Sequence, residues 1–116
     1  MALARLNYVE LPVSDIEASK AFFEAVAGWS LQDFAPSYSA TTNGDVDLGL
    51  QADKTEATSA PLPVIEVSDL DSLYQTVVKR GDEIIRPIFS FPGGRRFHVC
   101  EPSGNEIAFW QPIPEE

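Results

Sequence analysis

Cysteine, basic side chains and long apolar runs are all scarce in this chain, and each shortage excludes a class of protein. A single cysteine, Cys100, cannot form an internal disulfide, which favours a reducing compartment. No stretch approaches the roughly 20 apolar residues of a membrane span, and the first residues lack the apolar segment of a signal peptide. We therefore expect a cytoplasmic protein without a membrane partner.

Acidic residues outnumber basic ones by 18 to 8, which gives a formal net charge of −10. Phosphate backbones and anionic surfaces repel such a chain, so we expect no nucleic-acid partner. Five of the eight basic residues fall within 18 positions, at Lys79, Arg80, Arg86, Arg95 and Arg96. Either the first two complement the end of a helix and the others are solvated charges, or the cluster forms a positive pocket for an anionic small molecule.

The first half of the chain has the pattern of a β-α-β-β-β unit. Apolar and polar residues alternate along 6–13 as in a strand, and Ser14 with Glu17 fits a capping box at a helix start. The apolar stripe of that helix is Ile16, Ser19, Phe22, Phe23 and Val26. Further elements are predicted at 29–34 (strand), 36–40 (loop or strand start) and 45–51 (strand), the last entered through a hairpin at Asn43-Gly44.

After a polar, aperiodic linker at 52–61, the same order of elements restarts. The helix start at Ser68-Asp69-Leu70-Asp71 repeats that at Ser14-Asp15-Ile16-Glu17 with a spacing of 54 residues. The predicted elements are a strand at 63–67, a helix from 70 to Gly81, a strand at 83–88, a loop at 89–94, and a hairpin with strands at 95–101 and 106–111. The sequence thus predicts one domain, 1–116, with module one at 3–51 and module two at 62–112.

Two segments carry a resemblance to a known family: NYVELPVSDIEASKAFFEAVAGW near the start and GGRRFHVCEPSGNEIAFWQP near the end. With the tandem βαβββ halves, they resemble the vicinal oxygen chelate superfamily, which includes glyoxalase I, extradiol dioxygenases and bleomycin-binding proteins. The resemblance covers residues 3–112. It implies an α+β fold in which two tandem βαβββ modules curl a mixed β-sheet around a shared cleft, with helices outside, and it implies a homodimer.

The metal enzymes of this superfamily place a histidine or an acidic or amide ligand on the first and last strand of each half. In this chain those positions fall on Tyr8, on Asp47 (or Leu48), near Leu62, and on Ala108. Leucine and alanine offer no metal ligand, and tyrosine is a rare ligand for a divalent ion. Asp47 alone remains as a metal-ligand candidate, so the departures predict that the usual metal, and with it the usual glyoxalase I activity, is missing.

Alternation along the strands predicts which side chains face the cleft. The candidates are Tyr8, Glu10, Val64, Glu66, Ala108 and Trp110. Arg96, His98 and Cys100 join them if Phe97 and Val99, on the opposite face of the same strand, meet the helices.

Each candidate has a chemical and a structural interpretation. His98, the single histidine, is either a general base near neutral pH or a hydrogen-bonded residue of the cleft wall. Glu10 and Glu66 occupy matching repeat positions and either form a carboxylate pair with one raised pKa, or line a wet cleft or pair with Arg96. Tyr8 and Trp110 are either a stacking surface for a planar ligand or part of the core.

Three functions follow from these candidates. The leading hypothesis is a metal-independent protein that binds a small aromatic or anionic molecule through Tyr8, Arg96, His98 and Trp110. The alternative is a glyoxalase-like lyase, isomerase or dioxygenase that holds a divalent metal at a displaced site built from Asp47, His98 and Glu10 or Glu66. The third is a regulatory or interaction domain whose cleft is filled by its own side chains.

Overall fold

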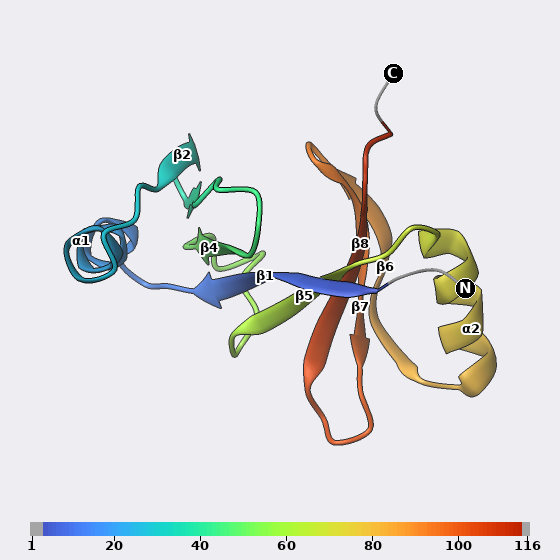
Figure 1. Cartoon of the computed structure of the whole chain (residues 1–116). Coiled ribbons are helices and arrows are strands. Elements are labelled where there is room, and N and C mark those ends of the chain that lie inside the picture. The colour runs from blue at the N-terminus through green and yellow to red at the C-terminus, as the bar shows by residue number, and fades with distance from the viewer. Residues whose placement is uncertain (1–3, 115–116) are drawn as a thin grey trace. The chain divides into compact units, whose positions relative to one another are not determined.

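The computed structural model describes residues 4–114, and within them the chain forms two compact units (Figure 1). The first unit comprises residues 7–62, and the second comprises residues 4–6 together with 63–114. Each half of the chain runs as one strand, one helix and three strands, so the predicted β-α-β-β-β repeat is confirmed. None of the helices in the described part of the chain is both long and apolar enough to cross a bilayer.

The first unit is built on strands in the order β2-β3-β4-β1. Their bounds are Arg5–Pro12 for β1, Gln32–Ala35 for β2, Tyr38–Ala40 for β3 and Asp47–Gln51 for β4. β1 runs parallel to β4, whereas β3 runs antiparallel to both β2 and β4. A parallel pair needs a long connection, which here includes helix α1 (Ile16–Val26); α1 contacts β3 and β4.

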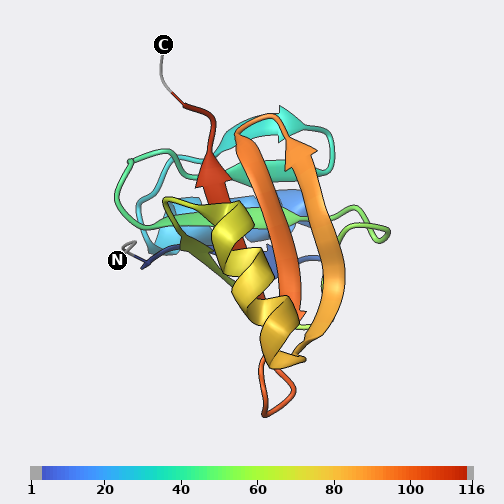
Figure 2. The same cartoon turned by 90° about the vertical axis from the view of Figure 1, so that its right-hand side faces the viewer.

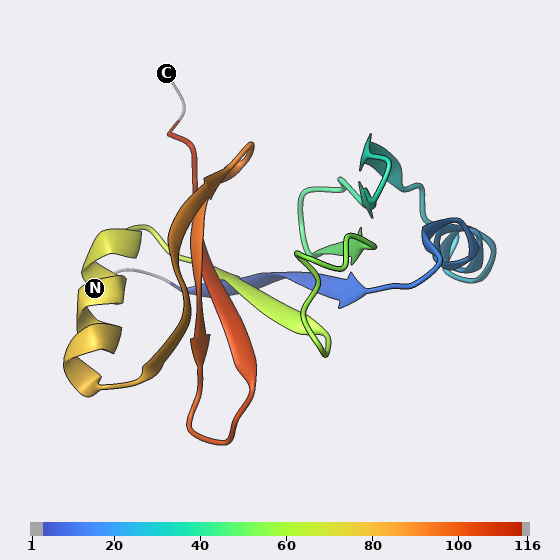
Figure 3. The ribbon, with the colours of Figure 1, turned by 180° about the vertical axis from the view of Figure 1, so that it is seen from behind.

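The second unit repeats this plan with strands in the order β5-β8-β7-β6. Their bounds are Leu62–Glu66 for β5, Glu83–Phe91 for β6, Gly94–Cys100 for β7 and Glu106–Pro112 for β8. β5 runs parallel to β8, and β7 runs antiparallel to both β6 and β8. Helix α2 (Leu70–Arg80) lies along one face of these strands, as Figure 2 and Figure 3 show from two sides.

The core of the second unit lies between α2 and this sheet. Its buried members are Val67, Leu70, Val77, Phe97 and Val99. Tyr74 of α2 meets Phe97 of β7 edge to face, with ring centroids 4.9 Å apart. The prediction that Phe97 and Val99 meet the helix is therefore confirmed, and the alternate residues of β7 must point to the other face of the sheet.

Both helices begin at an aspartate rather than at the serine before it. Asp15 Oδ1 accepts a hydrogen bond from the Ala18 N–H at 3.1 Å, as an N-cap does. The predicted N-cap, Ser14, is thus wrong by one residue, because either side chain can cap a helix and the aspartate is the one that reaches the third residue beyond it. α2 begins in the same way, at Asp69.

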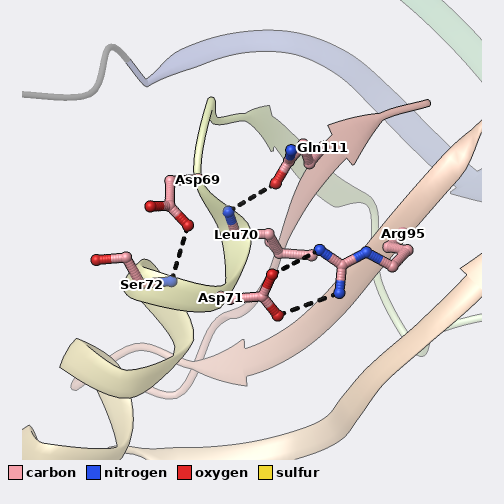
Figure 4. Close-up of polar contacts among 6 residues, drawn as sticks. All are labelled: Asp69, Leu70, Asp71, Ser72, Arg95 and Gln111. Carbon is pink, nitrogen blue, oxygen red and sulfur yellow. Dashed lines mark hydrogen bonds and ion pairs between the residues drawn. The ribbon is translucent and has the colours of Figure 1, made fainter. Parts of the chain in front are cut away.

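The start of α2 is tied to the sheet by two further contacts (Figure 4). Gln111 Oε1 of β8 accepts a hydrogen bond from the Leu70 N–H at 2.8 Å, which satisfies one of the free donors of the first helical turn. Arg95 of β7 donates two hydrogen bonds to the Asp71 carboxylate, at 3.1 and 2.8 Å. This pair lies on the surface, where solvent screening leaves it little net stabilisation.

The first unit departs from prediction in its helix. Phe22 and Val26, predicted to face inward, are 56% and 70% exposed. Phe23 stacks instead on Trp29, with ring centroids 5.5 Å apart. The strand predicted at 29–34 accordingly begins later, because Trp29 packs back on the helix before β2 starts at Gln32.

In the second unit the loop predicted at 89–94 is mostly strand, since β6 continues through Phe91. The pairing of β6 with β7 has two register shifts, one after Ile84 and one after Arg86. Such bulges break the period-two pattern on which the prediction relied.

Candidate functional site

The face of β7 and β8 that points away from α2 gathers the predicted site residues of the second unit. Arg96 of β7 lies directly opposite Trp110 of β8, and His98 lies opposite Ala108. Because paired residues point to the same side of a sheet, the structure brings Arg96, His98 and Trp110 together, as predicted. Tyr8 and Glu10 belong to the first unit.

His98 is held by a carboxylate that the sequence had not singled out. Its Nδ1 lies 2.6 Å from Glu106 Oε2, and the imidazole is 1% exposed. Glu106 stands two residues before Ala108 on β8, diagonal to His98 across the hairpin. Alternation places Glu106, Ala108 and Trp110 on one face, so the face was predictable, but the pairing with His98 depends on the strand register.

The electrostatics of this pair favour a neutral imidazole. Burial lowers the pKa of His98 below its ordinary value; the Glu106 hydrogen bond and charge act against this, while the charges of Arg96 and Arg86 act with it. A neutral imidazole that donates its Nδ1–H to Glu106 leaves Nε2 as an acceptor. Nε2 is buried and has no hydrogen-bond partner within residues 4–114.

Aromatic rings and guanidinium groups surround His98 on this face. The Arg86 guanidinium lies 3.7 Å from the centroid of the Phe89 ring, which in turn lies 5.8 Å from the imidazole. Arg96 lies 5.4 Å from the same Phe89 ring and 5.7 Å from Phe91. We call this set the cationic–aromatic face: Arg86, Phe89, Phe91, Arg96, His98 and Trp110.

Three members of the cationic–aromatic face were not predicted as ligand contacts: Arg86, Phe89 and Phe91. Phe89 and Phe91 were predicted to lie in a loop. Because β6 has register shifts, alternation along the sequence does not tell on which face of the sheet its residues lie. The density of basic residues at 79–96 was the available signal. In the structure Arg86 and Arg96 join this face, whereas Arg80 pairs with Asp82 at 2.8 Å.

In the first unit, Tyr8 and Glu10 of β1 meet Tyr38 of β3. The Tyr8 and Tyr38 hydroxyls are hydrogen-bonded to each other, and the Tyr38 hydroxyl donates to Glu10 Oε1 at 3.0 Å. Glu10 is 2% exposed. Burial, followed by the charge of Glu10, raises the pKa of Tyr38, so this phenol stays protonated and keeps donating.

Gly49 of β4 makes room for this hydrogen-bonded pair of phenols. A Cβ at position 49 would lie 2.0 Å from the Tyr8 hydroxyl and 2.3 Å from the Tyr38 hydroxyl. Gly49 does not have a positive φ. Glycine is therefore needed here for the space that the two phenols occupy, and not for its backbone conformation. Tyr38 was not a predicted site residue, because its strand is only three residues long.

Glu66, predicted to match Glu10 in the repeat, lies in the second unit and has a different environment. It accepts a hydrogen bond from Arg5 at 3.4 Å, and its side chain is 30% exposed. The proposed carboxylate pair of Glu10 and Glu66 would need both units, so it stays a prediction.

The superfamily's metal positions do not fit a divalent ion in this chain. Asp47 uses both carboxylate oxygens locally: one accepts from Thr41 Oγ1 at 2.7 Å and the other from the Gly44 N–H at 3.2 Å. The register pairs Tyr8 with Asp47, and the two positions that the resemblance gives in the second half are Leu62 and Ala108. The side chains of leucine and alanine carry no donor atom. Within residues 4–114, no three His, Cys, Asp or Glu side chains group as ligands.

Comparison with known proteins identifies the family. The Glyoxalase/Bleomycin resistance protein/Dioxygenase superfamily matches residues 5–109. The chain belongs to this superfamily. A curated relative from Mycobacterium tuberculosis, named "Putative glyoxylase CFP32", is 29% identical over 90% of this chain and 44% of its own length. The chain therefore spans less than half the length of the curated relatives that it matches.

Solved structures show the same superfamily fold. A superfamily member from Vibrio splendidus 12B01 has a TM-score of 0.74 and 26% identity, over 97% of this chain and 100% of that one. The Mn(II)-bound glyoxalase from Novosphingobium aromaticivorans has a TM-score of 0.68 and 19% identity, over 94% of this chain and 40% of that one. The predicted α+β class with tandem βαβββ modules is confirmed. The fold does not fix the reaction.

Proposed function

We propose that this superfamily member binds a small aromatic anion on the cationic–aromatic face without a resident metal ion. The observation that carries the proposal is the setting of Arg96 and Trp110, directly opposite each other on neighbouring strands, beside Arg86 stacked over Phe89. Guanidinium groups bind a carboxylate in a bidentate manner, and flat aromatic side chains offer a planar ligand apolar contact.

The rest of the chain supports selective recognition of an anion. With a formal net charge of −10, the protein repels anions in general. Two arginines on one face therefore supply a local attraction that the average surface lacks. Tyr8, which the sequence predicts as a further aromatic contact, belongs to the first unit, and its role stays a prediction.

The proposal of metal independence rests on the donor set. The side chains of Leu62 and Ala108 cannot bind a metal, and the Asp47 carboxylate already accepts hydrogen bonds within its own loop. The metal-dependent lyase, isomerase or dioxygenase stays the alternative, and we also propose a cytoplasmic homodimer. Size-exclusion chromatography with light scattering would test the dimer.

Binding is tested with phenylpyruvate and benzoate as probes, by calorimetric titration and thermal melting of chelator-stripped protein. A ligand at a hundredfold excess over its Kd adds about 2.7 kcal/mol to the unfolding free energy, which raises Tm. Arg96→Gln and Trp110→Leu should each weaken binding at least about tenfold. The first variant loses a charge-assisted hydrogen bond to the ligand, and the second loses an aromatic ring that stacks on it. The matched control Arg80→Gln, which removes an arginine that pairs with Asp82, should bind as the wild type does.

Two results would overturn the proposal. One is unchanged affinity in both Arg96→Gln and Trp110→Leu. The other is a rise in Tm with a single divalent ion among Ni, Zn, Mn, Fe(II) and Mg that His98→Ala abolishes, which would establish the metal-dependent alternative.

A further inference from the structure

The Asn43-Gly44 step carries a chemical reactivity that the proposed ligand site does not use. Three asparagines occur in the chain, and Asn43 is the one that a glycine follows. An asparagine side chain can react with the peptide nitrogen of the next residue, and glycine leaves that nitrogen open to approach because it has no Cβ. Asn43 and Gly44 both lie exposed in the loop between β3 and β4. Water therefore reaches the groups that would react.

The Asp47 carboxylate holds the nitrogen concerned. Its Oδ2 accepts a hydrogen bond from the Gly44 N–H at 3.2 Å, and its Oδ1 accepts one from the Asn43 N–H at 3.0 Å. The side chain of Asn43 is turned toward the residues that follow it, because its Oδ1 accepts the Asp45 N–H at 3.1 Å, as in an Asx turn. The loop thus keeps the side-chain amide of Asn43 beside the backbone while the Gly44 N–H is bound to a carboxylate.

We propose that Asn43 is a latent deamidation site and that the Asp47 carboxylate keeps it intact by holding the Gly44 N–H. In the reaction the Gly44 nitrogen forms a bond to Cγ of Asn43, and the bond from Cγ to Nδ2 breaks. The amide nitrogen leaves as ammonia with the proton from the Gly44 nitrogen. A water molecule then opens the cyclic imide at either carbonyl, which gives aspartate or isoaspartate at position 43. Water is the co-reactant, and nothing is oxidised or reduced.

Two physical effects of Asp47 oppose the first step. The Gly44 nitrogen attacks in its deprotonated form, and a carboxylate that accepts the N–H stabilises the protonated form instead. The negative charge of Asp47 also raises the energy of a second negative charge on that nitrogen. Both effects end when the carboxylate leaves the Gly44 N–H, so Asp47 sets the lifetime of Asn43.

Deamidation changes the loop that leads into β4. Thr41 Oγ1 donates to Asp47 Oδ1 at 2.7 Å and accepts the Leu48 N–H at 3.0 Å, so these contacts join the loop to the strand. An isoaspartate carries the backbone through Cβ, which adds one carbon between the two N–H groups that bind Asp47. The lengthened loop cannot restore both hydrogen bonds as they were. Release of Asp47 therefore leads to a change that the chain cannot reverse.

The lifetime of Asn43 is measured by peptide mass spectrometry after incubation of the protein at pH 7.5. Trypsin releases residues 21–54 as one peptide, in which Asn43 is the single asparagine. It releases residues 97–116 as another, in which Asn105 is an internal control because Glu106 follows it. We expect Asp47→Ser to deamidate at Asn43 at least about tenfold faster than the wild type, a difference of about 1.4 kcal/mol in activation free energy.

The matched control is Asp45→Ser. It removes an equal charge from an exposed residue of the same loop, and it keeps the backbone N–H that Asn43 Oδ1 accepts and the contact of Asp47 with Gly44. Its rate of deamidation should stay close to that of the wild type. Equal acceleration in Asp45→Ser and Asp47→Ser would refute the proposal, because it would assign the protection to loop charge and not to the hydrogen bond.

A second measurement does not depend on how the Asp47 variant folds. In concentrated urea the contact of Asp47 with Gly44 is lost, so the unfolded wild type should lose the Asn43 amide at least about tenfold faster than the folded wild type. Unfolded wild type and unfolded Asp47→Ser should react alike. A folded wild type that reacts as fast as the unfolded chain would overturn the protective role of Asp47. An Asn43 that stays intact even in the unfolded chain would show that this step is not a modification site.

Discussion

Gly49→Ala should destabilise the first unit more than a glycine replacement into open space in the same unit, such as Gly28→Ala. The added Cβ would lie 2.0 Å from the Tyr8 hydroxyl, 2.3 Å from the Tyr38 hydroxyl and 2.8 Å from Tyr8 Cζ. These distances are far below contact, so both phenol rings must move. Forcing one extra carbon into a packed site typically costs about 1–3 kcal/mol.

Movement of the rings has a second cost, since the Tyr38 hydroxyl donates to Glu10 Oε1. Glu10 is 2% exposed, so this hydrogen bond cannot simply be replaced by bulk water. A hydrogen bond to a charged group contributes about 1.5–3 kcal/mol. Together the two effects predict a loss of about 2.5–6 kcal/mol in unfolding free energy, a large part of the 5–15 kcal/mol typical of a domain.

Urea unfolding followed by tryptophan fluorescence measures this loss in the unit concerned. The chain has two tryptophans, of which Trp29 lies in the first unit and Trp110 in the second. In a Trp110→Phe background the signal therefore reports the first unit alone. Gly28→Ala is the control, because its Cβ meets nothing within 4 Å and its φ of 71° isolates the backbone cost, about 1–2 kcal/mol.

The reasoning is refuted if Gly49→Ala costs no more than Gly28→Ala. A double-mutant cycle adds a second check. Combining Gly49→Ala with Tyr8→Phe removes the nearest of the overlapping atoms, so the double variant should lose less stability than the two single variants summed. Strict additivity would show that the Tyr8 hydroxyl is not what excludes a side chain at position 49.

Two further predictions concern the second unit. Gln111→Ala should lower the unfolding free energy by about 1 kcal/mol, because the buried Leu70 N–H loses its acceptor. Urea unfolding measures this loss. An equal loss in the exposed control Gln75→Ala would contradict the assignment to this hydrogen bond. Lowering the pH from 7.5 to 5 should destabilise the wild type more than His98→Gln, because the folded-state pKa of His98 is lowered and the unfolded state therefore binds more protons below the ordinary value of 6.5. Parallel pH dependence in the two proteins, followed by thermal melting, would show that His98 is not buried as a neutral ring.

Alternation and repeat arguments predicted much of the second unit because its strand 95–101 follows a simple two-residue alternation between faces. The strand 95–101 has apolar residues on one face only, so the separation of Phe97 and Val99 from Arg96 and His98 followed directly. The pairing of His98 with Glu106 could not be predicted in the same way. It joins residues that are diagonal across a hairpin, and only the register sets which diagonal pair meets.

The other failed predictions have two physical causes: two side chains that can serve equally well, and a strand too short to show a pattern. Ser14 and Asp15 can both cap a helix, and the sequence does not reveal which takes the position. β3 is too short to show a period, and it brings Tyr38 to the Tyr8–Glu10 pair through tertiary pairing alone. The ligand hypothesis for Tyr8 remains a prediction, since it concerns a site that would draw on both units.

The two helices differ in how many residues they bury, and this difference affects where the folded chain unfolds locally. α2 buries Leu70 and Val77 and ends in a glycine-capped turn with Lys79 and Arg80, whereas α1 has no buried residue and no base in its last turn. Amide protons of α1 should therefore exchange with solvent through small local fluctuations, while those of α2 wait for the core to separate. The repeat thus joins a slowly exchanging helix to a rapidly exchanging one, and protease cleavage is expected to begin in α1.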